Sequence, residues 1–260
     1  MNFLKIITSA ALTALCLSSC SGSADESTDE FTDEKTYAET LSDNLDAGQY
    51  YIDMVISGTD YETDMPCIMI ENGSDGYVSM TLSGVVTEFY TVDSATYMIM
   101  EDICCYQLTD ETGGFGNGFL KIGEGDSLTD TSSQDGIVTE IYTSSGDSSE
   151  SANETYTFTF DEESGDLLSF TAKSDNETTT ADINSISWEG SEIVMPDITG
   201  WSDISNENLD EDTQLKITLY FMGVTEQMLE DNGTTFDEAI KLSDEELNDL
   251  LDKMEIDIYN

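Results

Sequence analysis

The sequence of 260 residues contains no histidine and no arginine, and its only basic side chains are seven lysines. Without histidine, a Ser-His-Asp triad, a Cys-His pair and a histidine-ligated zinc or haem site are excluded. Without arginine, no guanidinium is present to hold a phosphate by two parallel hydrogen bonds. Carboxylate pairs of the kind used in glycoside hydrolysis are an alternative, but among 56 acidic residues no pair stands out. We therefore expect a protein that is not an enzyme and that uses no cofactor and no metal.

Negative charge dominates the composition. The acidic side chains outnumber the lysines so far that the formal net charge is −49 at pH 7. Such a surface repels nucleic acid, which proteins hold through Lys and Arg, and it also repels anionic lipid headgroups. We therefore expect no nucleic-acid partner, and the simplest role of the charge is solubility.

The first twenty residues have the composition of a bacterial lipoprotein leader. Lys5 precedes an apolar or small stretch over residues 6–17, which is too short to span about 30 Å of hydrocarbon. The following Leu17-Ser-Ser-Cys20 resembles a lipobox, whose cysteine thiol accepts a diacylglyceryl group. We predict that Cys20 is lipidated and anchors the chain at the extracytoplasmic face of the cell membrane. An ordinary cleaved signal with a chance cysteine is the alternative.

The composition divides the chain into four parts. Residues 1–19 are expected to be the signal peptide, and residues 20–33 the lipidated cysteine with a flexible acidic linker. Residues 34–203 are expected to form the sheet domain, and residues 204–260 an acidic helical module.

The sheet domain is expected to open with a helix from Asp33 to Leu45 that Thr32 caps. After it, short segments rich in β-branched and aromatic residues alternate with glycine turns, which predicts an antiparallel meander. In the cleanest of these segments, Tyr156, Phe158 and Phe160 share one face. The eleven expected strands are Tyr50–Ser57, Cys67–Glu71, Tyr77–Leu82, Val85–Val92, Thr96–Glu101, Cys104–Leu108, Ile137–Thr143, Thr155–Phe160, Leu167–Lys173, Thr178–Trp188 and Ile193–Met195.

A glycine-rich polar segment from Asp110 to Gly136 interrupts these strands. It carries four apolar residues, Phe115, Phe119, Leu120 and Ile122. We expect them either to pack onto the core or to form a lid over a ligand. With the aromatic face of the 155–160 strand, they are the candidate ligand-lining residues.

The last part of the chain is expected to be helical. Ser243 and Glu246 form a capping box, and Leu247, Leu250 and Leu251 give the helix that follows an apolar stripe. The four expected helices are Leu215–Met222, Thr225–Glu230, Thr235–Lys241 and Asp244–Met254.

Three cysteines follow Cys20. Export would permit a disulfide between Cys67 and either Cys104 or Cys105, although all three thiols can equally remain reduced. No Cys-x-x-Cys motif is present, which argues against a redox site.

The order of these features resembles a known family. An N-terminal helix is followed by Tyr51-Ile-Asp-Met, Ile70-Glu-Asn-Gly and Tyr77-Val-Ser-Met, then by a Tyr156-Thr-Phe hairpin and a closing Met195-Pro-Asp-Ile-Thr-Gly. This order is similar to the LolA/LolB-like lipoprotein fold, which includes the LppX-like lipoproteins. The resemblance implies a mainly β (α+β) protein whose antiparallel, unclosed curved sheet, or half-barrel, wraps around helices. It also implies an apolar cavity that shelters acyl chains.

We therefore expect a membrane-anchored lipoprotein whose half-barrel binds a lipid, another apolar small molecule or an envelope protein. Family members that carry lipoproteins use an arginine in the barrel, and this chain has none, which argues against a lipoprotein carrier. The alternative is a structural or interaction lipoprotein with a solid core, whose C-terminal helices dock a partner. Residues 96–100 are apolar on both faces, which suits either arrangement.

Overall fold

The computed structural model describes residues 35–59, 63–82, 85–109, 117–123, 125–144, 154–174, 177–205, 209–254 and 256. Twelve strands lie in these residues, and their order runs from β12 (Ser202–Asp203) at one edge to β7 (Asp126–Gln134) at the other. The sheet is therefore not closed. The predicted fold class, a mainly β protein with an unclosed antiparallel sheet and a small C-terminal helical part, is confirmed.

The chain forms two compact units. Of the described residues, those numbered up to 74 and those within 113–192 belong to the first unit, and those within 75–112 and from 193 onward belong to the second. All helices after residue 204 thus belong to the same unit as β3 (Asp75–Leu82), β4 (Val85–Val92), β5 (Ala95–Met100) and β6 (Cys105–Thr109).

In the first unit, seven antiparallel strands stand in the order β2-β1-β11-β10-β9-β8-β7. Burial alternates along β1, where Tyr50, Ile52, Met54 and Ile56 are buried and the residues between them are half-buried. One face of this sheet therefore forms the core. The remaining bounds are β1 (Gln49–Gly58), β2 (Met65–Asn72), β8 (Ile137–Ser144), β9 (Glu154–Asp161), β10 (Leu167–Lys173) and β11 (Thr178–Ser187).

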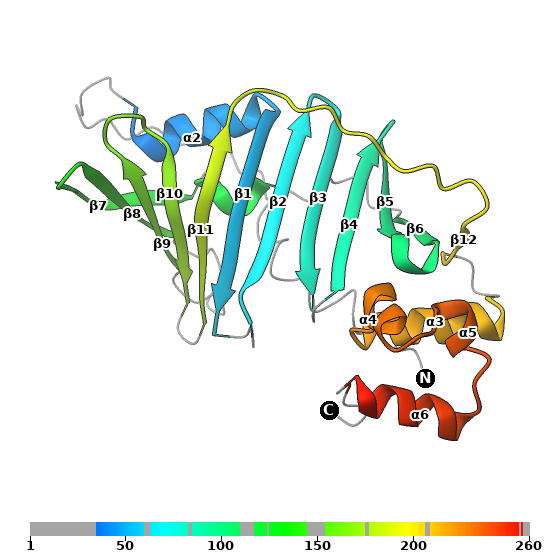
Figure 1. Cartoon of the computed structure of the whole chain (residues 1–260). Helices are drawn as coiled ribbons and strands as arrows, with labels where there is room; N and C mark the ends of the chain where they lie inside the picture. Colours follow the sequence, from blue (N-terminus) through cyan, green and yellow to red (C-terminus); the bar gives the residue numbers. More distant parts are fainter. Residues whose placement is uncertain are drawn as a thin grey trace. The chain divides into compact units, whose positions relative to one another are not determined.

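Two short helices cover the core face of the first unit. Both α2 (Tyr37–Asp46) and η2 (Asn117–Leu120), a 3₁₀ helix, lie on the same side of the sheet, inside its curve (Figure 1). From α2, Ala38, Leu41 and Leu45 are buried against the strands.

Helix α2 begins at Tyr37, so the expected start at Asp33 with Thr32 as cap is wrong. Thr36 has extended backbone and accepts a hydrogen bond from the Glu39 N–H, while the Glu39 side chain accepts one from the Thr36 N–H. This reciprocal capping box satisfies two backbone donors that a helix start leaves unpaired.

The second unit places its strands in the order β12-β6-β5-β4-β3. Pairing is antiparallel except between β12 and β6, where Ser202 lies beside Cys105. Met98, Ile99 and Met100 of β5 are all buried, so the sheet is covered on both faces at this strand.

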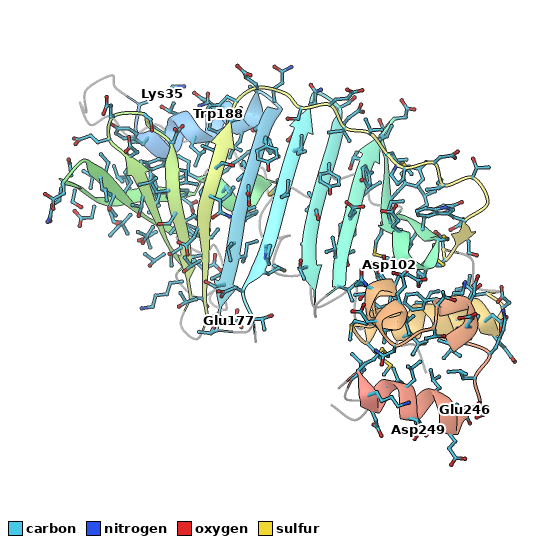
Figure 2. All side chains as sticks on the ribbon, in the orientation of Figure 1. Lys35, Asp102, Glu177, Trp188, Glu246 and Asp249 are labelled. Atoms are coloured by element: carbon cyan, nitrogen blue, oxygen red, sulfur yellow. The ribbon has the colours of Figure 1, made fainter. Side chains whose placement is uncertain are left out.

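Four helices and one 3₁₀ helix complete the second unit and gather near the ends of β4–β6 (Figure 1). The Tyr220 hydroxyl donates a hydrogen bond of 2.6 Å to the Val86 carbonyl, and Lys216 lies 2.5 Å from Asp237. Figure 2 shows Glu246 and Asp249 on the last helix. The bounds are η1 (Glu101–Ile103), α3 (Glu211–Phe221), α4 (Glu226–Asp231), α5 (Phe236–Ala239) and α6 (Asp244–Lys253).

Besides α2, four elements differ from the expected ones. Strand β7 occupies part of the segment expected to interrupt the sheet, and β12 was not expected. Residues 193–195 form no strand. Helix α3 begins at Glu211, ahead of the expected start at Leu215, because the Asp210 side chain caps it by accepting from the Thr213 N–H at 2.9 Å.

Among the described helices, none is long and apolar enough to cross a membrane.

Candidate functional site

An aromatic cluster fills the concave face of β8, β9 and β10. In the middle of the cluster, the Phe158 ring lies 5.0 Å from Phe170, 5.7 Å from Tyr142 and 6.2 Å from Phe160, measured between ring centroids. Phe158 and Phe160 are fully buried, and Phe170 is 2% exposed. Strand alternation places these rings on one face, and register sets Phe158 opposite Phe170. Offset and edge contacts of this kind add to the stability that burial provides.

Helix η2 covers one end of this cluster. Leu120 is fully buried, whereas Phe119 is half-buried with its ring edge-on to Phe170 at 6.1 Å. Tyr156 stacks on Phe170 at 6.1 Å and is also half-buried. The cluster thus has a closed centre and an accessible margin formed by Phe119 and Tyr156.

Three polar contacts fasten the segment that contains η2. The Lys121 ammonium lies 2.6 Å from Asp46 at the end of α2, and the Ile122 N–H donates to the Ser42 hydroxyl at 3.3 Å. The Gly123 N–H donates to Asp126 at 2.6 Å. None of these contacts is deeply buried, so the polar contacts themselves contribute little free energy. Burial of the Leu120 side chain, worth about 1.5–3 kcal/mol, is the larger contribution that holds this segment in place.

Carboxylates and hydroxyls line the accessible margin. The Tyr156 hydroxyl donates to Glu154, two residues earlier on the same strand face. Burial, followed by the hydrogen bond to Glu154 and the negative charges of Glu154 and Asp126, raises the pKa of Tyr156 well above its usual value. In the register, Ser144 stands opposite both Asp126 and Glu154, so these three residues share the face of the aromatic cluster.

At the other end of the cluster, a carboxylate is buried. Glu140 is 3% exposed and accepts hydrogen bonds of 2.9 Å from the N–H groups of both Tyr37 and Ala38. The Tyr142 hydroxyl lies 2.8 Å from the Thr36 hydroxyl and 3.4 Å from Glu140. Burial is the main cause that raises the pKa of Tyr142 to about 12. Fully paired in this way, Glu140 holds the start of α2 on β8.

Among the described residues there is neither a metal-binding group nor a disulfide bond that could mark a functional site. No group of three or more Cys, Asp or Glu side chains there is arranged to hold a metal ion. Cys67, Cys104 and Cys105 are free thiols, so the considered pairing is not formed. Burial raises the pKa of Cys67 to about 12 and that of Cys105 to about 11.

Most of the candidate residues named from the sequence meet in this cluster. Phe119 and the three aromatic residues of β9 contribute to it. Leu120 is fully buried next to Phe119 in η2, and the Ile122 N–H bonds to Ser42 of α2. Phe115 and Cys20 lie outside the described residues. Sequence reasoning missed Phe170, Tyr142 and Glu140. Phe170 had a signal, since it occupies a core-facing position of the predicted 167–173 strand.

No protein-family model matches the sequence. No curated protein matches it either. Among solved structures, the chain is similar to LprF from Mycobacterium bovis, with 12% identity and a TM-score of 0.39 over 62% of this chain and 96% of that chain. A LolA superfamily protein, NE2245 from Nitrosomonas europaea, gives 10% identity and a TM-score of 0.29 over 62% and 96% of the two chains.

A third similar structure is a putative outer membrane lipoprotein-sorting protein domain from Vibrio parahaemolyticus, with 9% identity and a TM-score of 0.27 over 70% of this chain and 97% of that chain. The likeness concerns the fold, and the function proposed for this chain rests on its own residues.

Proposed function

We propose that this chain is an exported lipoprotein, anchored through lipid on Cys20, whose first unit binds an apolar ligand against the aromatic cluster of β8–β10. The observation that carries this proposal is the incomplete cover of the cluster. Phe119 and Tyr156 remain half-buried beside the buried ring of Phe170. A ligand chain that enters beneath η2 would contact the cluster without any strand having to separate.

The weak attachment of η2 supports the same function. One ion pair with a largely exposed aspartate and one hydrogen bond of 3.3 Å join this segment to α2. An exposed ion pair contributes only about 0.2–1 kcal/mol. Lifting η2 also exposes Leu120, which costs about 1.5–3 kcal/mol. Each methylene that a ligand buries contributes about 0.8 kcal/mol, so a chain of about five or more methylenes offsets the whole cost.

The sequence of the leader supports the anchor. A basic residue, an apolar stretch and Leu17-Ser-Ser-Cys20 stand in the order of a lipoprotein signal. Two acyl chains on one cysteine hold a protein stably on a bilayer, where a single chain does not. The proposed place of the protein is therefore the extracytoplasmic face of the cell membrane.

Binding of a neutral apolar fluorophore, N-phenyl-1-naphthylamine, tests the proposal. The mature chain, residues 20–260 with Cys20→Ser, is expected to enhance its fluorescence saturably. Phe119→Asp is expected to weaken binding about tenfold, because it places a charge where a ring contacted Phe170. Leu168→Asp is the matched control, since Leu168 lies in β10 close to Phe170 but is exposed. Absence of fluorophore binding by the folded chain would refute the proposal.

A structural or interaction lipoprotein is the second candidate, and one observation favours it. Phe158, Phe160 and Leu120 are fully buried, as in a solid core without room for a ligand. In that case the C-terminal helices would bind a partner protein through their acidic surface. The fluorophore experiment separates the two candidates, because a solid core binds none.

A further inference from the structure

The margin of the aromatic cluster carries charge of one sign. Glu154 and Asp126 both lie on the concave face, on either side of Ser144, and both are half-buried. Strands in a sheet are about 4.8 Å apart, so these two carboxylates stand about 10 Å from each other across β8. Tyr156 lies on the same strand face as Glu154, and its ring stacks on Phe170.

Both carboxylates keep acceptor capacity after their contacts within the protein. Glu154 accepts from the Tyr156 hydroxyl, and Asp126 accepts from the Gly123 N–H. An ionised carboxylate has about four lone-pair sites, so one contact leaves several free. These contacts fix the two side chains at the margin and leave their negative charge uncompensated.

No cation among the described residues neutralises this margin. Lys121 is the lysine of the η2 segment, and its ammonium is paired with Asp46 at 2.6 Å. Lys173 of β10 stands opposite Thr155, whose side chain points to the other face of β9 from Tyr156. An anionic group placed at the margin would therefore meet two carboxylates and no partner.

From this arrangement we propose that the site selects amphiphiles with a cationic head, an amine or quaternary ammonium joined to an alkyl chain, and rejects fatty acids and other anionic lipids. The alkyl chain contacts Phe119, Tyr156 and Phe170, and the head lies between Glu154 and Asp126. The inference rests on the proposed apolar-ligand function and specifies the ligand class of the same site. Opposite charge at a partly buried position favours one head group over the other by electrostatic complementarity.

A matched pair of ligands tests the selectivity. Dodecylamine and dodecanoic acid have the same chain length and opposite charge at pH 7, and dodecanol is the neutral reference. Each competes with N-phenyl-1-naphthylamine for the mature chain (residues 20–260, Cys20→Ser), below the concentration at which it forms micelles. The amine is expected to displace the fluorophore at a concentration about tenfold lower than dodecanol, and the acid only at a higher one.

Three substitutions that each remove one negative charge distinguish the effect of the site from the effect of the overall negative surface. Glu154→Gln and Asp126→Asn are each expected to reduce the preference for the amine over dodecanol, measured as the ratio of the two displacing concentrations, about threefold to tenfold. Glu163→Gln, at an exposed turn at the other end of β9, removes the same charge and is expected to leave the preference unchanged. Circular dichroism verifies that all three variants keep the fold.

Two outcomes overturn this inference alone. The first is displacement by amine and acid at equal concentrations, and the second is a preference that Glu163→Gln lowers as much as Glu154→Gln does. Absence of any fluorophore binding by the folded chain instead refutes the proposed function itself. The experiment therefore distinguishes a wrong prediction of cationic selectivity from a wrong prediction of apolar-ligand binding.

Discussion

The buried carboxylate of Glu140 accepts a hydrogen bond of 2.9 Å from the backbone N–H of Ala38, a residue 102 positions earlier in the chain. Its other oxygen accepts from the N–H of Tyr37 at the same distance. Both donors belong to the first turn of α2, where a helix leaves N–H groups unpaired and where negative charge is favourable. A single strand residue therefore fixes the start of the helix that covers the aromatic cluster.

Glu140→Ala is expected to lower the free energy of unfolding by about 2–4 kcal/mol, because it leaves two N–H groups buried without acceptors. Glu140→Gln, which keeps one acceptor oxygen, is expected to cost less. Glu39→Ala is the matched control, since Glu39 is exposed and only completes the capping box of the same helix, worth about 1 kcal/mol. Urea unfolding measures all three. Equal losses for Glu140→Ala and Glu39→Ala would show that the buried contact is not special.

The sequence predicts the strands that carry apolar side chains and misses those that carry almost none. Strand β9 was found because aromatic and threonine side chains alternate along it, as half-buried strands require. Strand β7 was missed because its side chains are almost all exposed polar groups, and it is held by pairing with β8 alone. Residues 193–195 have the apolar composition of a strand but no neighbouring strand with which to pair.

Helix starts were harder to predict, because several residues near them can serve as caps. Thr32 and Thr36 are both suitable, and the sequence favours Thr36 only when Glu39, three residues later, is counted as the second half of a capping box. Asp210 likewise lies in an acidic run in which each aspartate resembles a linker residue.

The aromatic residues of the candidate site were predicted from the sequence. Glu140 gave no signal, because its role depends on a register that brings β8 to α2.

The three thiols are expected to react at very different rates. Cys104 is exposed, whereas Cys67 and Cys105 are buried with pKa values raised to about 12 and about 11. At pH 8 the two buried thiols are therefore protonated, and only a thiolate is nucleophilic. Alkylation with iodoacetamide at pH 8, read by mass spectrometry, is expected to label Cys104 in the native protein and all three thiols after denaturation.

The same shifts predict a loss of stability in base. A thiol whose pKa is raised by folding stabilises the native state below its unfolded value, near 8.5, and this contribution disappears as the pH rises through the folded value. Stability is therefore expected to fall between about pH 8.5 and pH 11–12. Cys67→Ser is expected to make this decline less steep. For the alkylation experiment described above, labelling of Cys67 or Cys105 in the native protein as fast as Cys104 would contradict the burial of these two thiols.

Cys20→Ala is expected to abolish membrane attachment. The lipid on Cys20 is the proposed anchor, and none of the described helices can cross a bilayer. Partition of cell extracts into a detergent phase measures attachment, and Cys104→Ala is the control, since Cys104 is exposed but lies outside the lipobox. An alanine variant at position 20 that still enters the detergent phase would disprove the anchor.

The ion pair between Lys121 and Asp46 is expected to control how fast a ligand enters beneath η2. Lys121→Glu replaces attraction by repulsion between two carboxylates, and an exposed pair of this kind is worth about 0.2–1 kcal/mol. Opening of η2 should then become about twofold to fivefold more frequent, and stopped-flow association of N-phenyl-1-naphthylamine should accelerate by the same factor. The double variant Lys121→Asp with Asp46→Lys restores the opposite charges and is expected to restore the slower rate. Lys35→Glu is the matched control, because Lys35 pairs with Asp43 on α2 without involving η2. If Lys35→Glu accelerates association as much as Lys121→Glu, the added negative charge and not the opening of η2 determines the rate.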